Sequence, residues 1–279
     1  MPEKRRKRRA EFLKLLNEEE KKELRKNIYD IHELKQFVGA GHVIDRSGHS
    51  AATVFETQNG YYIKCETPGA LALEYQMTNI FYQLGFGPEA VQYITLDRDY
   101  MVTRKMPGEN LTRDLQDPLR ICRVLADALR RLHSQPIRSS IHSSIPVSGR
   151  YVRYMESAEG TLDGASYDPS VYTGEYRLSS RKEAWEVMQR GKHLLCLDTL
   201  IHGDACLPNI LQKNGTFCSF VDVSMGGIGD RHIDLYWAIW SLQYNLKTSA
   251  YTDAFLDYYG RNNFSKDMFK VIAACEAFG

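Results

Sequence analysis

The sequence lacks the features that mark several broad classes of protein. No apolar run approaches the roughly 18 residues that a membrane span requires. None of the six cysteines forms a C-x-x-C pair, so neither a zinc site nor a disulfide framework is indicated. No G-x-x-x-x-G-K-[ST] motif occurs, which argues against a Walker-type nucleotide site. We therefore expect free, buried thiols in a reducing compartment and no membrane partner.

The chain also has almost no net charge. Thirty-six Lys and Arg against thirty-five Asp and Glu leave a formal charge of +1, so no overall field attracts nucleic acid or an acidic membrane. One local exception is the basic block 4–9, and we favour a solvated arm over an anionic-surface tether or targeting signal. Lys14 and Glu18–Glu20 interrupt the segment that follows, which argues against a secretory signal and for a cytoplasmic location.

The pattern of predicted elements divides the 279 residues into two parts. Up to residue 105 we expect a helix over 10–26, a hairpin over 54–64 turning at Asn59–Gly60, a helix over 70–84, and strands over 91–96 and 99–105. Beyond the connector 106–110 we expect helices around 121–132 and near 181–195, 234–246, 250–260 and 264–277. We predict an N-terminal extension (1–36), a small β lobe that binds nucleotide (37–105) and a larger helical lobe (106–279), with the ligand between the lobes.

One segment carries most of the chemical information. His202, Asp204 and Asn209 have the spacing of kinase catalytic loops, and Asp222 follows a predicted hairpin at Asn214–Gly215. Phosphoryl transfer needs a carboxylate that orients the attacking hydroxyl, and oxygen ligands that hold Mg²⁺ on the phosphates. We expect Asp204 to be the catalytic base and Asn209 and Asp222 to hold magnesium. The alternative is that these are ordinary turn and capping residues.

The β-rich part is expected to hold the nucleotide. Lys64 lies in a predicted strand among largely apolar neighbours, where an unpaired ammonium is costly to bury. Glu74 in the next helix is a suitable partner, as in kinases, although an exposed edge-strand lysine is the alternative. The turn Ser47-Gly48-His49-Ser50 could wrap phosphates with N–H groups and hydroxyls. Gly39-Ala40-Gly41 lacks the third glycine of a dinucleotide fingerprint.

Two interpretations stay open for Asp234, which precedes an apolar helical stretch. Its side chain could cap that helix, or it could accept hydrogen bonds from the backbone of the catalytic loop. Trp237 and Trp240 in the same stretch are expected to be core residues.

The segment His202-Gly203-Asp204-Ala205-Cys206-Leu207-Pro208-Asn209 resembles the H-G-D-x-x-x-x-N signature of the aminoglycoside phosphotransferases. The four residues between Asp204 and Asn209, A-C-L-P, are those seen at these positions in the 3′-phosphotransferase branch. Similarity continues through 229–234, and the hinge at Arg104 to Met106 and the terminal Glu276-Ala277-Phe278 fall in family order. The resemblance covers about residues 38–279.

This resemblance implies an α+β, two-lobed, protein-kinase-like fold that binds ATP and Mg²⁺ and phosphorylates a polycationic aminoglycoside. His202 and Asp234 would be structural, and the protein would act as a monomer. We expect the nucleotide to contact Lys64, Glu74, Ser47, His49, Ser50, Arg104 and Met106. The substrate would contact Glu276 and Phe278, together with Glu175 of an inserted segment, 151–180.

Two departures from the family pattern leave other functions open. The 3′-phosphotransferases usually carry an Arg shortly after the second magnesium Asp, whereas this chain has Ser224-Met225-Gly226-Gly227, and an extra Gly279 follows the terminal Phe. A kinase of another small hydroxyl compound is one alternative. A nucleotide-binding pseudokinase is another, but the intact Asp204, Asn209 and Asp222 argue against it.

Overall fold

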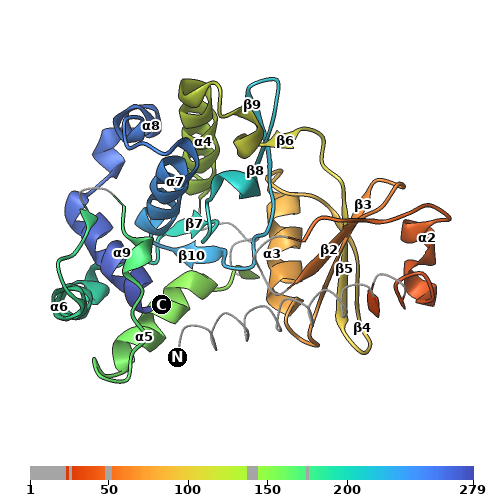
Figure 1. Cartoon of the computed structure of the whole chain (residues 1–279), viewed down its shortest axis with the longest axis horizontal. Coiled ribbons are helices and arrows are strands. Elements are labelled where there is room, and N and C mark those ends of the chain that lie inside the picture. The colour runs from red at the N-terminus through yellow and green to blue at the C-terminus, as the bar shows by residue number, and fades with distance from the viewer. Residues whose placement is uncertain (1–22, 25–26, 48–51, 137–143, 174–175) are drawn as a thin grey trace, which may run out of the picture. The chain divides into compact units, whose positions relative to one another are not determined.

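The structure is a computed structural model that describes residues 23–24, 27–47, 52–136, 144–173 and 176–279 (Figure 1). These residues form two compact units, one within Met1–Ala72 and Glu89–Lys105 and the other within Leu73–Pro88 and Met106–Gly279. The predicted boundaries at residues 36 and 105 stay predictions. The basic block and most of the helix predicted over 10–26 lie outside the described residues.

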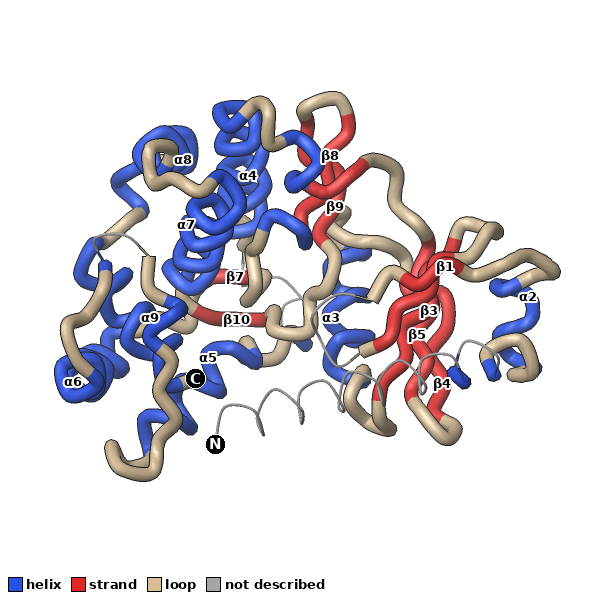
Figure 2. The backbone as a smooth tube through the Cα atoms, viewed as in Figure 1, coloured by secondary structure: helices blue, strands red, loops and turns tan. Residues whose placement is uncertain are grey.

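The first unit is built on a five-stranded antiparallel sheet in the order β1-β2-β3-β5-β4 (Figure 2). Its strands are β1 (Ile44–Asp45), β2 (Thr53–Glu56), β3 (Tyr61–Glu66), β4 (Ala90–Thr95) and β5 (Asp99–Arg104). The hairpin predicted around Asn59–Gly60 is confirmed, and Gly60 has a left-handed φ of 81° that suits glycine. The two later strands are confirmed as the antiparallel pair β4 and β5.

Side chains of β3 alternate between the core and the surface, as the period of a strand requires. Ile63 is buried, and it packs in one cluster with Phe55 and Val102 of the neighbouring strands. Two short helices, η1 (His32–Leu34) and α2 (Lys35–Val38), add Leu34 and Phe37 to this cluster. The sheet is therefore covered by apolar side chains from the segment that precedes it.

A buried carboxylate fixes the loop before the first long helix. Asp99 is fully buried and accepts hydrogen bonds from Leu71 N–H at 3.0 Å, Tyr93 Oη at 2.9 Å and Thr95 Oγ1 at 2.7 Å. Burial acts to raise the pKa of Asp99, but these hydrogen bonds bring it below its ordinary value of 3.8. The ionised carboxylate thus stabilises this part of the first unit.

The second unit is mostly helical. Its α-helices are α3 (Ala72–Gln83, shared with the first unit at its first residue), α4 (Pro118–His133), α5 (Gly149–Glu159), α6 (Arg181–Gly191), α7 (Arg231–Leu246), α8 (Thr252–Tyr259) and α9 (Lys266–Phe278). The 3₁₀ turns are η2 (Leu111–Asp114), η4 (Pro169–Val171), η6 (Lys192–Leu194), η7 (Leu207–Asn209) and η8 (Arg261–Asn263). The predicted helices are confirmed, with the end of the one near 181–195 continued by η6. Helix α5 was not predicted.

Two small sheets flank the turns that contain Asp204, Asn209 and Asp222. β6 (Glu109–Asn110), β8 (Ile210–Lys213) and β9 (Thr216–Phe220) form one, and β7 (Thr199–Ile201) pairs with β10 (Gly227–Gly229) in the other. The hairpin at Asn214–Gly215 is confirmed, with left-handed φ values of 55° and 75°. The connector prediction is wrong for Glu109 and Asn110, because they pair with β8.

Several expectations about burial need correction. Trp240 is partly exposed along α7 and is not a core residue, whereas Trp237 is partly exposed but packs against the buried core of the second unit. Among the six free cysteines, all of which are described, Cys65, Cys122 and Cys275 are buried as expected, whereas the others are exposed or half-buried. Among the described helices, none combines the length and the apolar character needed to cross a membrane. The predicted α+β class is confirmed.

Candidate functional site

The predicted catalytic residues lie on two turns of the second unit. The first turn joins β7 to β8, and β7 packs against α7 (Figure 1). The second turn follows β9 and leads to β10. Val221 N–H of the second turn donates to the backbone oxygen of Asn209 at 3.0 Å. This bond joins the turn that carries Asp204 to the turn that carries Asp222.

Gly203 makes the tight path of the first turn possible. Its φ is 80°, and a Cβ built on it would lie 2.0 Å from the backbone oxygen of Met225. A side chain is therefore excluded by backbone conformation and by space together. Pro208 in η7 restricts the backbone, and Leu207 N–H donates to Ser241 Oγ of α7 at 2.9 Å.

Asn209 holds the predicted base directly. Its Nδ2 donates to the backbone oxygen of Asp204 at 3.0 Å and to the carboxylate Oδ2 of Asp204 at 3.1 Å. With the nitrogen turned toward Asp204, the amide oxygen of Asn209 is left as an acceptor. An amide oxygen is a hard ligand of the kind that Mg²⁺ prefers.

Asp222 adopts a backbone conformation that is unusual for a residue with a side chain. Its φ is 58°, in the left-handed region. Such conformations cost on the order of 1–3 kcal/mol and are concentrated at functional sites. Within the described residues, no three His, Cys, Asp or Glu side chains gather into a metal-binding group. One amide oxygen and one carboxylate, completed by phosphates and water, nevertheless form a donor set that fits Mg²⁺.

His202 links the two turns. Its Nδ1 accepts the Asp204 N–H at 3.2 Å, so the ring proton lies on Nε2, which donates to the backbone oxygen of Val221 at 3.0 Å. The ring is fully buried beside Phe81 and Phe220. This environment supports the predicted structural role.

Asp234 accepts hydrogen bonds from the backbone of the turn that carries Asp204. Its carboxylate is fully buried and accepts His202 N–H at 2.8 Å and Gly203 N–H at 2.7 Å. The capping interpretation is wrong, because Asp230 caps α7 by accepting His232 N–H at 2.9 Å. Sequence reasoning missed His133 of α4, whose Nε2 lies 3.0 Å from Asp234 Oδ2. No local signal marks a histidine that acts across 101 residues of sequence.

The predicted nucleotide residues divide between the two units. Lys64 lies on β3 opposite Val54 and Met101, and Glu74 is buried in the first turn of α3. Their pairing stays a prediction. Met106 belongs to the second unit, where it is the first residue of the segment Met106–Gly279.

The remaining nucleotide candidates lie in the first unit. Ser47 N–H donates to Asp45 Oδ1 at 2.8 Å, and its Oγ accepts Val54 N–H at 3.1 Å. Arg104 forms an exposed ion pair with Glu89 at 3.0 Å. His49 and Ser50 lie outside the described residues, and so does Glu175 of the predicted substrate site.

A pocket of about 250 Å³ contains the other two predicted substrate residues. Its lining includes Arg150, Tyr167, Asp168, Trp237, Glu276 and Phe278. Phe278 packs against Tyr167, with ring centres 5.3 Å apart. Asp168 is exposed, and hydrogen bonds from Ser170 hold the pKa of its carboxyl below the usual value. Asp168 N–H also donates to the backbone oxygen of Ala277 at 2.8 Å.

Glu276 itself is buried among donors. Its Oε1 accepts from the hydroxyl of Tyr154 and from Trp237 Nε1 at 2.5 Å, and its Oε2 lies 3.5 Å from Arg150 Nη1. Burial raises the pKa of Glu276, and the attraction to Arg150 together with these hydrogen bonds opposes that effect. Arg150 was not singled out from the sequence.

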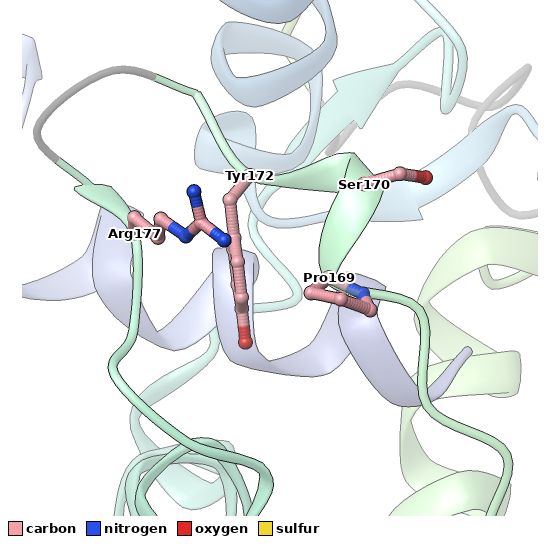
Figure 3. Close-up of a pocket in the computed structure, with 4 residues that line it drawn as sticks. All are labelled: Pro169, Ser170, Tyr172 and Arg177. Atoms are coloured by element: carbon pink, nitrogen blue, oxygen red, sulfur yellow. The ribbon is translucent and has the colours of Figure 1, made fainter.

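A second pocket, of about 410 Å³, lies at η4 (Figure 3). Its lining includes Pro169, Ser170, Tyr172 and Arg177. The guanidinium of Arg177 lies beside the ring of Tyr172, whereas Ser170 points away from both (Figure 3). These four described residues include none of the predicted site residues, so this pocket is not part of the candidate site.

Comparison with known proteins identifies the family of the chain. Residues 44–270 match the family model of the phosphotransferase enzyme family. A protein of Lactococcus lactis subsp. lactis (strain IL1403), named probable aminoglycoside 3′-phosphotransferase, is 34% identical over 266 residues, which are 92% of this chain and 98% of that protein. The chain belongs to the phosphotransferase enzyme family, and the resemblance to aminoglycoside phosphotransferases is confirmed.

Solved structures show the same fold. An aminoglycoside-3′-phosphotransferase of type VIII has a TM-score of 0.68 at 20% identity, covering 89% of this chain and 97% of that one. Aminoglycoside phosphotransferase APH(3″)-Id from Streptomyces rimosus, solved with ADP and streptomycin, has a TM-score of 0.63 at 19% identity, covering 88% and 96%. The predicted kinase-like fold is confirmed.

Proposed function

We propose that this enzyme transfers the γ-phosphoryl group of ATP to a hydroxyl of an aminoglycoside, as a 3′-phosphotransferase. One observation carries the proposal: Asn209 binds the carboxylate of Asp204 through its nitrogen and keeps its oxygen for a cation. Base and metal ligand are thereby held in one turn, as phosphoryl transfer requires. The 34% identity to the Lactococcus lactis protein supports the type of acceptor.

In the proposed reaction, Asp204 orients the acceptor hydroxyl and takes its proton. The hydroxyl oxygen forms a bond to the γ-phosphorus, the bond from that phosphorus to the β,γ-bridging oxygen breaks, and ADP leaves. Asn209 and Asp222 would hold Mg²⁺, which when bound neutralises charge on the phosphates. His202 and Asp234 keep Asp204 in place through the hydrogen bonds described above. In the first unit, Lys64 would bind phosphate oxygens.

The pocket that contains Asp168 and Glu276 is the proposed acceptor site. The exposed carboxylate of Asp168 is ionised at neutral pH, since the ordinary pKa of an aspartate lies well below 7 and the hydrogen bonds from Ser170 lower it further. An anionic group at a pocket rim attracts the ammonium groups of a polycation. The partly exposed ring of Trp237 offers an apolar surface in the same pocket.

The test is a coupled ADP-release assay with ATP or GTP and pairs of aminoglycosides that differ only at the 3′-hydroxyl. We expect turnover with the 3′-hydroxyl compounds and ATP, and the phosphorylated position can be assigned by ³¹P NMR. No turnover with any aminoglycoside would reject the acceptor. Turnover with 3′-deoxy compounds would move the reaction to another hydroxyl.

We further infer a cytoplasmic monomer without a nucleic-acid partner. The near-neutral net charge supports the absence of nucleic-acid binding. A solution mass equal to one 32.0 kDa chain is the expected result of light scattering.

A further inference from the structure

A buried guanidinium lies behind the catalytic turn. Arg150, the second residue of α5, is only 8% exposed. Its Nε donates to the backbone oxygen of Gly203 at 3.0 Å, and its Nη1 lies 3.5 Å from Glu276 Oε2. The guanidinium carbon also lies 4.8 Å from the centre of the Trp237 ring. These contacts all belong to the second unit.

Placing a cation here is costly unless its interactions are specific. Burial acts to lower the pKa of Arg150, yet attraction to Glu276 and other nearby groups raises it above the ordinary value. The planar guanidinium can bind a carbonyl and a carboxylate with different nitrogens while it stacks on an aromatic ring. A lysine could not make the same three contacts. The position thus needs the shape of arginine as well as its charge.

The carbonyl that Arg150 binds belongs to the peptide group between Gly203 and Asp204. The N–H of the same peptide group, at Asp204, donates to His202 Nδ1 at 3.2 Å. Both polar groups of this peptide are therefore held by side chains, one on each side. Because this peptide leads directly into the Cα of Asp204, its orientation sets the direction of the catalytic carboxylate.

Glu276 pairs with the Nη1 end of the Arg150 guanidinium, whereas Gly203 is bound by Nε. One oxygen of Glu276 accepts from Tyr154 and Trp237, and the other faces Arg150. The side chain is 5% exposed. A carboxylate with both oxygens engaged inside the protein is poorly placed to be a main ligand for a substrate ammonium.

We propose that Arg150 is a positioning residue for Asp204, and that Glu276 acts on the reaction through Arg150 rather than chiefly by binding the acceptor. This inference builds on the proposed phosphotransfer function. The sequence led us to expect that Glu276 binds the substrate. The present proposal instead makes the rate of the chemical step, and not the affinity for acceptor, depend on Arg150 and Glu276.

The test uses the full chain and the variants Arg150→Lys and Glu276→Gln. Arg190→Met is the matched control, because Arg190 is exposed on α6 and pairs only with Glu186 among the contacts described. Two activities are measured for each protein: phosphate transfer to an aminoglycoside, and slow ATP hydrolysis with no acceptor present. The second activity does not involve acceptor binding, so a residue that merely binds acceptor leaves it unchanged.

We expect Arg150→Lys and Glu276→Gln to lower kcat for transfer by about tenfold to a hundredfold, the scale of a small misplacement of a reacting group. Acceptor-free ATP hydrolysis should fall by a similar factor, with KM for acceptor within about threefold of wild type. Arg190→Met should match wild type in both activities. A raised KM with unchanged kcat and unchanged ATP hydrolysis would overturn the proposal and make Glu276 an acceptor ligand.

Loss of folding is separated from loss of positioning by a second variant. The double variant Arg150→Met/Glu276→Gln removes both charges and leaves no unpaired buried ion. A double variant that melts near the wild-type temperature and shows the same loss of ATP hydrolysis would support the positioning role. A folded double variant that hydrolyses ATP at the wild-type rate would contradict that role. ATP hydrolysis is measured without acceptor, so it tests the role of Arg150 even if the wild-type enzyme phosphorylates no aminoglycoside. That second result would contradict the proposed function and leave the positioning test intact.

Discussion

The carboxylate of Asp234 accepts the backbone N–H of Gly203 at 2.7 Å, so a helix fixes the turn that carries Asp204, the proposed catalytic base. The same carboxylate accepts His202 N–H at 2.8 Å and faces His133 at 3.0 Å. A turn whose amides point at one buried acceptor cannot rotate without leaving them unsatisfied. The positions of Asp204 and Asn209 therefore depend on side chains far away in the sequence.

Substitution of the base should abolish most of the transfer. In Asp204→Asn the proton acceptor is lost while the shape is retained, so kcat should fall by at least about a hundredfold with ATP affinity little changed. Asp198→Asn is the control, since Asp198 is an exposed carboxylate just before β7. Steady-state kinetics and ATP titration check this. Equal kcat in Asp204→Asn and wild type would remove Asp204 from the mechanism.

Removal of the Asp234 carboxylate should destabilise the second unit. Asp234→Ala leaves the amides of His202 and Gly203 without acceptors, at a cost of about 1–3 kcal/mol each. We expect a decrease of about 2–5 kcal/mol in the free energy of unfolding, measured with urea. Asp253→Ala, at a side chain that is 81% exposed, should change it by less than about 0.5 kcal/mol. Similar values for the two variants would contradict the role of Asp234.

Two glycines with nearly the same φ angle give a matched pair. Gly60 and Gly203 have φ values of 81° and 80°, but a Cβ at Gly60 meets no atom within 4 Å, whereas one at Gly203 would lie 2.0 Å from Met225 O. Gly60→Ala should cost about 1–2 kcal/mol for its backbone conformation. Gly203→Ala should cost clearly more and should also lower kcat. Urea unfolding and the coupled assay measure both effects, and equal costs would contradict the close approach to Met225.

The stability conferred by Asp99 should depend on pH. Folding lowers the pKa of Asp99, so its contribution to stability is present above the unfolded value of 3.8 and is lost as pH falls through the lower folded value. Asp99→Asn should therefore destabilise the protein by about 2–4 kcal/mol near pH 7, and the difference from wild type should shrink below about pH 4. Urea unfolding across this range tests it. A difference that does not depend on pH would show that the charge of Asp99 is not involved.

The sequence predicted the parts of the site that are local. The spacing from His202 to Asn209 and the turn at Asn214–Gly215 determine their own geometry over a few residues, and the structure has both. Helix α5 was missed because its buried face consists of Arg150, Tyr154 and Ala158, and the arginine interrupts the apolar pattern at helical spacing. Arg150 and His133 were missed for a different reason. Their roles arise from contacts 53 and 101 residues away, which no local pattern encodes.

The placement of Asp168 has a consequence for how the enzyme could diversify. Its backbone N–H is bound to the backbone oxygen of Ala277, so the position of this pocket residue is set by main-chain atoms that every amino acid except proline possesses. Replacing the side chain would then alter the rim of the pocket while the anchoring bond persists. Selection for a new antibiotic could act on residue 168 at the cost of one capping hydrogen bond, the one that the Asp168 carboxylate accepts from Ser170 N–H at 2.8 Å, and without touching the turn that carries Asp204.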